Sequence, residues 1–159
     1  VLPKFQEVLP NPLTEILVDS FVANMDASDV EIREKSFEIL HELADQRHQH
    51  VVEAVQTAAS KGQNGVLGLD ETLSVAYNGR VQVLVVERDY HQPGYRCQGC
   101  GYLTTQELES CVFCGEEFEE IPDAVEAVVT QTVDKGGGVE VVDNDMMPER
   151  SRIGALLRY

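Results

Sequence analysis

The sequence lacks long apolar runs and is poor in basic residues. None of its apolar stretches approaches the roughly 20 residues that a membrane-spanning helix needs, so we expect a soluble protein without membrane contact. The 159 residues include 12 lysines and arginines against 28 aspartates and glutamates, a formal net charge of −16. General nucleic-acid binders use basic groups to neutralise phosphates, so this balance argues against direct nucleic-acid binding.

Several catalytic motifs are also missing. The sequence has no Walker loop, no dinucleotide-binding glycine fingerprint and no nucleophile elbow. His41 and Glu42 begin like a metalloprotease helix, but Asp45 stands where that motif requires its second histidine. His48 and His50 are two residues apart, on different faces of a helix, and are interpreted as solvated. No enzymatic activity is expected.

The length and composition predict one globular domain with at most a short appendage. Hydrophobic residues make up 43% of the chain and charged residues 25%, an ordinary balance that excludes collagen and disulfide-stapled miniproteins. The sequence opens with Val1 rather than methionine, and no signal-peptide pattern follows. We therefore expect it to be part of a longer chain.

The N-terminal part predicts an irregular lead-in followed by a long helix. Three prolines lie within residues 1–13, and Leu13–Ala23 is compatible with either a short strand or a helix. Ser28 and Glu31 have the spacing of a capping box, and Lys61 precedes a glycine that can end the helix. The helix would run about 33 residues, or roughly 50 Å. Its expected core-facing residues are Phe37, Leu40, Ala44, Val51, Val55 and Ala58.

The rest of the chain alternates strands with helices, which predicts a layered α/β domain with a mixed sheet. The β-branched run Val81–Val86 is typical of a strand covered on both faces. A helix is expected from Pro122, with Val125, Val128, Val129 and Val133 on one side. The remaining elements are a brief helix at Asp70–Tyr77 stopped at Gly79, a helix stop at Gly136–Gly138, and strands at Val139–Val142 and Ile153–Tyr159.

An insert over residues 91–120 contains all four cysteines. Cys97 and Cys100 form one Cys-x-x-Cys pair, Cys111 and Cys114 form a second, and ten residues separate the pairs. Two thiolates on a tight turn bind one edge of a tetrahedral ion, and a glycine follows each pair to permit the positive φ of such turns. The spacing favours structural Zn²⁺ in a reducing cytosol. Rubredoxin-like iron and a redox dithiol stay open as alternatives.

Four cysteine ligands leave no coordination position for an activated water, so the expected role of the metal is structural. His91 is a less favoured candidate, which would be a ligand only if one of the cysteines does not bind the metal. The insert is also acidic, with no Lys or Arg between Thr104 and Pro122. We interpret its glutamates as a solvated surface, in preference to a docking surface for a basic protein. They are Glu107, Glu109, Glu116, Glu117, Glu119 and Glu120.

Several segments together resemble the C-terminal (third) domain of archaeal and eukaryotic class 1 peptide chain release factors and of Pelota, particularly bacterial-type relatives. The segments are Gly68–Leu73, Gly79–Glu87, the Ile121-Pro122 helix start, Gly138–Val142 and Arg152–Tyr159. The family's Gly-Gly-Gln and Asn-Ile-Lys-Ser motifs are missing, and Tyr95-Arg96-Cys97 lacks the phenylalanine of the codon-reading motif. Termination activity is therefore not carried over.

The resemblance implies a three-layer α/β/α sandwich like that of kink-turn-binding ribosomal proteins, spanning residues 27–159 and carrying the zinc-ribbon insert. Residues 1–26 would be the tail of a preceding domain. The implied function is that of a cytoplasmic, non-catalytic adaptor in translation termination or ribosome rescue. A translational GTPase or ribosome-associated proteins are the expected partners. The alternative is an RNA-binding module that uses the kink-turn surface of the related ribosomal fold.

Overall fold

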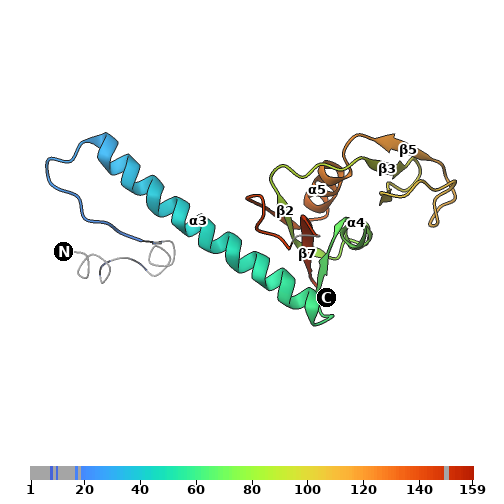
Figure 1. Ribbon diagram of the computed structural model, residues 1–159, viewed down its shortest axis with the longest axis horizontal. Helices are drawn as coiled ribbons and strands as arrows, with labels where there is room; N and C mark the ends of the chain where they lie inside the picture. The colour runs from blue at the N-terminus through green and yellow to red at the C-terminus, as the bar shows by residue number, and fades with distance from the viewer. Residues whose placement is uncertain (1–7, 9, 11–16, 18, 149–150) are drawn as a thin grey trace. The chain divides into compact units, whose positions relative to one another are not determined.

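The computed structural model describes residues 8, 10, 17, 19–148 and 151–159 (Figure 1). The chain separates into two compact units, Val1–Asp45 and Gln46–Tyr159, and helix α3 (Asp29–Ser60) contributes residues to both. Among the described residues, no helix combines the length and apolar character needed to cross a membrane. Most of the predicted proline-rich lead-in lies outside the described residues, as do residues 13–16 and 18 of the Leu13–Ala23 element. Residues 19–23 form neither helix nor strand.

Helix α3 begins at the predicted capping box. The N–H of Ser28 donates to Glu31 Oε2 at 2.8 Å, and the N–H of Glu31 donates to Ser28 Oγ at 3.3 Å. The first of these bonds, and secondly the Ser28 hydroxyl, which donates to Glu31 Oε2 at 3.1 Å, lower the pKa of the Glu31 carboxyl. Two backbone donors that the helix itself cannot satisfy thus find acceptors, and this explains why the helix starts at Asp29.

A mixed four-stranded sheet forms the centre of the Gln46–Tyr159 unit, as the alternating pattern predicted. Its strands are β1 (Gly65–Leu67), β2 (Val81–Glu87), β6 (Gly138–Val142) and β7 (Ile153–Leu157), in the order β1-β7-β2-β6. β2 pairs in parallel with β6 and antiparallel with β7, while β1 pairs antiparallel with β7. The strand predicted to be central is therefore an interior strand.

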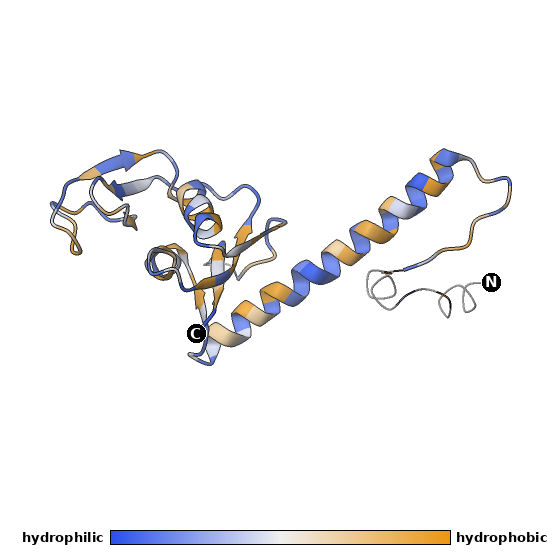
Figure 2. Ribbon diagram, turned by 180° about the vertical axis from the view of Figure 1, so that it is seen from behind, coloured by the Kyte–Doolittle hydropathy of each residue, from blue (hydrophilic) through white to orange (hydrophobic). Residues whose placement is uncertain are grey.

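Two hydrophobic clusters involve alternate residues of β2. Leu84 belongs to a cluster with residues of helices α4 (Leu69–Tyr77) and α5 (Ala124–Asp134). Val85 belongs to a second cluster that includes Val55 of α3. Both β2 side chains are fully buried, and the strands of this sheet are largely apolar (Figure 2). Burial on both faces explains why the β2 sequence is nearly uninterrupted in apolar residues.

Helices α4 and α5 end in the same glycine motif. Gly79 (φ +67°) and Gly136 (φ +74°) adopt left-handed backbone conformations directly after the C-cap residues. After α5, the Gly136 N–H donates to the Val133 carbonyl and the Gly137 N–H donates to the Thr132 carbonyl, each at 2.9 Å. This is the Schellman pattern, and it confirms the helix stops predicted from the two glycine positions.

The start of α5 differs from the prediction. The helix begins at Ala124 rather than Pro122, and Asp123 is its N-cap. The Asp123 carboxylate accepts a hydrogen bond from the Val125 N–H at 2.9 Å. An aspartate that satisfies a free helix donor determines the helix start more strongly than the fixed φ of a proline.

The apolar faces predicted for α3 and α5 are longer than the parts of these helices that pack in the core. Val55 of α3 is buried, but Phe37 and Leu40 are 63% and 55% exposed, so the prediction that they face a core was wrong. The hydrophobic cluster that α3 joins involves only residues near its C-terminal end. In α5, Val128 is buried whereas Val133 is 57% exposed. Val133 lies outside the arc of the helix that contacts the sheet.

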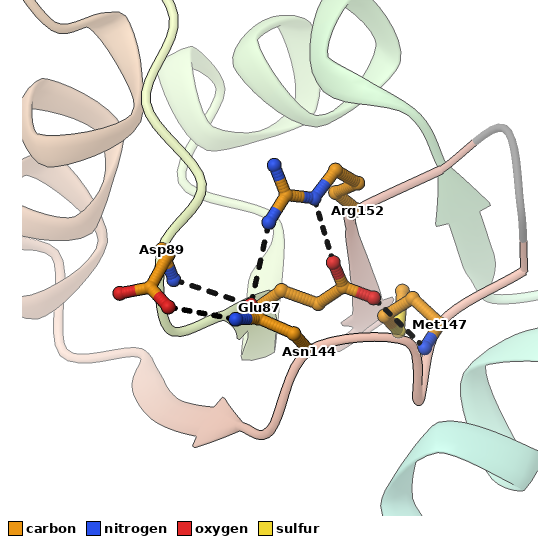
Figure 3. A network of polar contacts seen from close by, with 5 residues as sticks. All are labelled: Glu87, Asp89, Asn144, Met147 and Arg152. Atoms are coloured by element: carbon orange, nitrogen blue, oxygen red, sulfur yellow. Dashed lines mark hydrogen bonds and ion pairs between the residues drawn. The ribbon is translucent and has the colours of Figure 1, made fainter.

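A buried carboxylate lies at the C-terminal end of β2. Glu87 is 4% exposed, and its side chain accepts hydrogen bonds from Arg152 Nε at 2.7 Å and from the Met147 N–H at 3.2 Å (Figure 3). Arg152 also donates to Asn144 Oδ1 at 3.3 Å, and the Asn144 amide donates to Asp89 at 2.7 Å. This network fixes the loop after β6 against the ends of β2 and β7.

Candidate metal centre

A second, three-stranded sheet positions the cysteines. It comprises β3 (Gly94–Cys97), β4 (Leu103–Thr104) and β5 (Phe118–Ile121), in the order β4-β3-β5. Cys97 is the last residue of β3 and pairs with Phe118, the first residue of β5. One cysteine pair thus follows β3 and the other precedes β5, so the sheet brings the two pairs to the same end. This sheet is the insert predicted between β2 and α5.

The two cysteine turns, residues 97–102 and 111–116, have the same backbone hydrogen bonds. In each turn the N–H of the first cysteine donates to the carbonyl five residues later, at 2.9 Å in both cases. The glycine after the second cysteine donates back to the carbonyl of the first, at 3.0 Å for Gly101 and 2.8 Å for Gly115. These glycines have φ values of +74° and +80°, which confirms the predicted need for positive φ.

All four sulfur atoms converge on one point. Cys97 Sγ lies 3.3 Å from Cys114 Sγ, and Cys100 Sγ lies 3.6 Å from Cys111 Sγ. The four Sγ atoms are all within 4.8 Å of one another. A tetrahedron of sulfurs around Zn²⁺ with bonds of about 2.3 Å has edges of about 3.8 Å. The cluster therefore has the donor atoms and the dimensions to bind one metal ion.

The thiols differ in their surroundings. Cys97 and Cys111 are buried, Cys100 is half-buried and Cys114 is exposed. A hydrogen bond from the Tyr77 hydroxyl lowers the pKa of Cys100 to about 6 and raises the pKa of Tyr77 to about 12. Tyr77 belongs to α4, so a side chain from outside the insert donates to the sulfur cluster. Such donors orient metal-binding side chains.

Aromatic and polar contacts hold the insert against the helices of the main sheet. The Tyr77, Tyr102 and Phe113 rings form a cluster with centroid separations of 4.8 to 5.2 Å. The Gln131 side-chain amide of α5 donates to the Gly101 carbonyl at 3.2 Å, and Leu103 of β4 is buried in the same cluster as α4 and α5. The insert is thus continuous with the core of the unit.

The other candidate ligands lie elsewhere. Within the described part of the chain, the four cysteines are the one group of three or more metal-ligating side chains that converge. His91 Nδ1 instead donates to Asp123 Oδ2 at 2.6 Å. His41 and His50 are exposed on α3, and His48 is half-buried. No second histidine completes the motif that His41 and Glu42 begin.

The sequence prediction missed the residues that connect the cysteines to the helices. Tyr77 closes a short helix 20 residues before the first cysteine, and no spacing rule links the two positions. Gln131 had no signal either, because a half-buried glutamine is common on helix surfaces. Of the three aromatic residues, Tyr102 and Phe113 lie within the two cysteine turns, so their positions in the sequence pointed to the site.

Asp123 connects the insert to α5, and its charge should make stability depend on pH. Burial would raise the pKa of its carboxyl, but hydrogen bonds from His91 and from the N–H groups of Glu126, Val125 and Gln92 outweigh that effect and lower the pKa. Its stabilising contribution is therefore complete above the unfolded-state pKa, about 3.9, and is lost as the pH falls through the lower folded-state value.

We expect Asp123→Ala to reduce the free energy of unfolding by about 1 kcal/mol at pH 7, the usual cost of losing an N-cap. The difference from the native chain should shrink below about pH 4, where the native carboxyl becomes protonated. Urea denaturation of the native chain and the variant at several pH values measures this difference in the free energy of unfolding. Asp123→Asn is the control, because asparagine caps without titrating. A constant difference down to pH 2 would contradict the assignment.

Two solved structures share this architecture. The C-terminal domain of a peptide chain release factor from Methanosarcina mazei matches with a TM-score of 0.59 and 19% identity, over 86% of this chain and 98% of that one. Pelota from Archaeoglobus fulgidus matches with a TM-score of 0.57 and 18% identity, over 89% of this chain. The chain has the fold of these domains. It spans 39% of the length of the Pelota chain.

The fold match confirms the predicted resemblance to the C-terminal domains of release factors and Pelota. At 19% and 18% identity, the likeness establishes a shared fold and leaves activity and partners to be argued separately. No protein-family model matches the sequence, and no curated protein matches it.

Proposed function

We propose that residues 27–159 form a non-catalytic, protein-binding domain of a release-factor-like protein that acts in translation termination or ribosome rescue in the cytoplasm. The observation that carries this proposal is the match over 98% of a release-factor C-terminal domain. A translational GTPase or a ribosome-associated protein is the proposed partner. Residues 1–26 would be the tail of a preceding domain.

We also infer that Cys97, Cys100, Cys111 and Cys114 bind one structural Zn²⁺. Four thiolates fill a tetrahedral shell and leave no position for a reacting water. The matching backbone bonds of the two cysteine turns and the 3.3 and 3.6 Å sulfur separations support this site. Bound metal would hold residues 91–120 in position against α4 and α5. Iron is the competing ion, because four sulfurs also suit it.

The three-layer α/β/α arrangement of kink-turn-binding ribosomal proteins is part of the proposal. Its support is that helices contribute to hydrophobic clusters on both sides of β2. An RNA-binding module would be the second function, but it needs free basic groups. Arg88, Arg96 and Arg152 are in ion pairs with Asp143, Glu119 and Glu87. Arg80 and Arg158 donate to backbone carbonyls, and Arg150 lies outside the described residues.

Affinity capture tests the proposed function. The tagged 159-residue chain, loaded with zinc, is incubated with an extract of its own host, and the retained proteins are identified by mass spectrometry. We expect enrichment of a translational GTPase or ribosomal proteins over an unrelated domain of similar net charge. Nuclease-treated extract separates direct protein contacts from RNA bridging. Salt-sensitive binding to a structured kink-turn RNA, with no protein retained, would favour the RNA-binding function instead.

A further inference from the structure

A groove of about 460 Å³ lies between α5 and the insert, within the Gln46–Tyr159 unit. Ala127 and Gln131 of α5 line one side of it, and Leu103 and Ile121 of the insert line the other. These residues give the groove a partly apolar lining with a helix along its length. The groove is distinct from the sulfur cluster, although Gly101 of the first cysteine turn contributes to its wall.

The helix side of the groove carries two uncompensated negative charges. Glu126 and Asp134 both line it, and they lie eight residues apart on α5, a rise of about 12 Å. Thr130 lies midway between them, so the three form one stripe of the helix. Within the described residues, neither carboxylate makes an ion pair or a side-chain hydrogen bond.

The other charged groups of the groove are already paired. Arg96 donates to Glu119 from Nε at 2.8 Å and from Nη2 at 2.7 Å. The Asp123 carboxylate is occupied by His91 and by the first turn of α5. The groove therefore presents a net negative charge that arises from Glu126 and Asp134.

Gln131 lies where the groove meets the first cysteine turn. Its Nε2 donates to the Gly101 carbonyl at 3.2 Å, which fixes the orientation of the side-chain amide. Its Oε1 is buried and has no hydrogen-bond partner in the described structure. Because this oxygen has almost no accessible surface, Gln131 forms part of the groove wall rather than an acceptor for a ligand.

We propose that this groove binds an extended segment of a partner protein that carries arginine or lysine side chains. The aliphatic part of such a side chain packs on Ile121 and Ala127, which are half-buried, and its charged end reaches Glu126 or Asp134. A phosphate backbone has the wrong sign for this lining. The inference deepens the proposed function, on which it rests, by assigning the chemistry of the partner.

The test measures the affinity of labelled peptides for the whole zinc-loaded chain. The probe is a fluorescein-labelled nonapeptide in which arginine alternates with leucine, and its counterpart alternates glutamate with leucine. The groove variant combines Glu126→Gln with Asp134→Asn. The matched control combines Glu107→Gln with Glu109→Gln, which removes the same charge from exposed positions of the insert that do not line the groove.

We expect the arginine peptide to bind the native chain and the control alike, and to bind the groove variant about tenfold more weakly. The glutamate peptide should not bind. Amide chemical-shift changes in the native chain should concentrate in residues 96–103 and 121–134. Equal weakening in both variants, or shift changes centred elsewhere, would overturn the proposal. Both variants should show native melting temperatures, because these exposed carboxylates lack partners.

A capture experiment in host extract separates this inference from the proposed function. If the native chain and the groove variant retain the same translation protein equally well, the groove is not the docking site and the protein-binding function stands. If the native chain binds the arginine peptide in the groove but retains no translation protein, the groove assignment stands and the proposed function fails. Loss of capture in the groove variant alone would support both.

Discussion

Replacing Cys111 with serine should abolish tight metal binding and unfold the insert, while the four-stranded sheet stays folded. Cys111 is 3% exposed and its sulfur lies 3.6 Å from that of Cys100, so serine removes one of four ligands from the interior of the site. Loss of a direct ligand should weaken metal binding by more than about 100-fold, the upper range for losing a supporting contact. Without the ion, few large apolar side chains remain to hold the insert together.

Elemental analysis and amide hydrogen exchange measure the two effects. The native chain should contain one metal ion, and its amides in Gly94–Cys97 and Phe118–Ile121 should be protected from exchange. In Cys111→Ser that protection should disappear, whereas protection in β2 and β7 should persist. Gln98→Ala, an exposed position within the first cysteine turn, is the control and should retain the metal. Native protection of the insert in metal-free, reduced protein would refute a structural ion.

Glu87→Ala should lower the free energy of unfolding by about 3 kcal/mol. The substitution leaves the Met147 N–H without its acceptor and Arg152 without its carboxylate partner, and it also opens a small cavity. Breaking a buried ion pair commonly costs about 3 to 5 kcal/mol, but Arg152 is 42% exposed and can be rehydrated, so we expect the lower end of that range. Urea denaturation at pH 7 provides the measurement.

The neighbouring ion pair supplies the control. Arg88 lies next in sequence and pairs with Asp143 at 3.1 Å, but both side chains are more than half exposed. Arg88→Ala should therefore cost less than about 0.5 kcal/mol. Glu87→Gln, which keeps an acceptor for the Met147 N–H, should fall between the two alanine variants. Equal effects of the two alanine substitutions would show that the contacts of Glu87 do not stabilise the loop.

Local chemistry made much of the fold predictable. The capping box at Ser28, the glycine stops at Gly79 and Gly136, and the β-branched run of β2 each act within a few residues, so their structural effect is readable from the sequence. The cysteine spacing is equally local, because each turn uses its own backbone bonds. These signals gave the mixed sheet, the helix ends and the convergence of the four thiols.

Long-range packing explains what the sequence did not predict. Phe37 and Leu40 follow the same helical period as Val55, yet only the tertiary structure determines where along α3 the core ends. Glu87 ends an apolar strand, and its burial depends on Arg152, 65 residues later. Tyr77 and Gln131 contact the cysteine turns only because α4 and α5 pack beside the insert, an arrangement that no periodicity encodes.

The first cysteine turn also forms part of the groove wall, so metal binding and peptide binding should affect each other. Gly101 accepts from Gln131, lines the groove, and directly follows Cys100. An ion that orders this turn therefore also shapes one side of the groove, and a peptide seated there in turn favours the ordered turn. Because coupling between two ligands is reciprocal, the factor by which the ion tightens peptide binding equals the factor by which the peptide tightens ion binding.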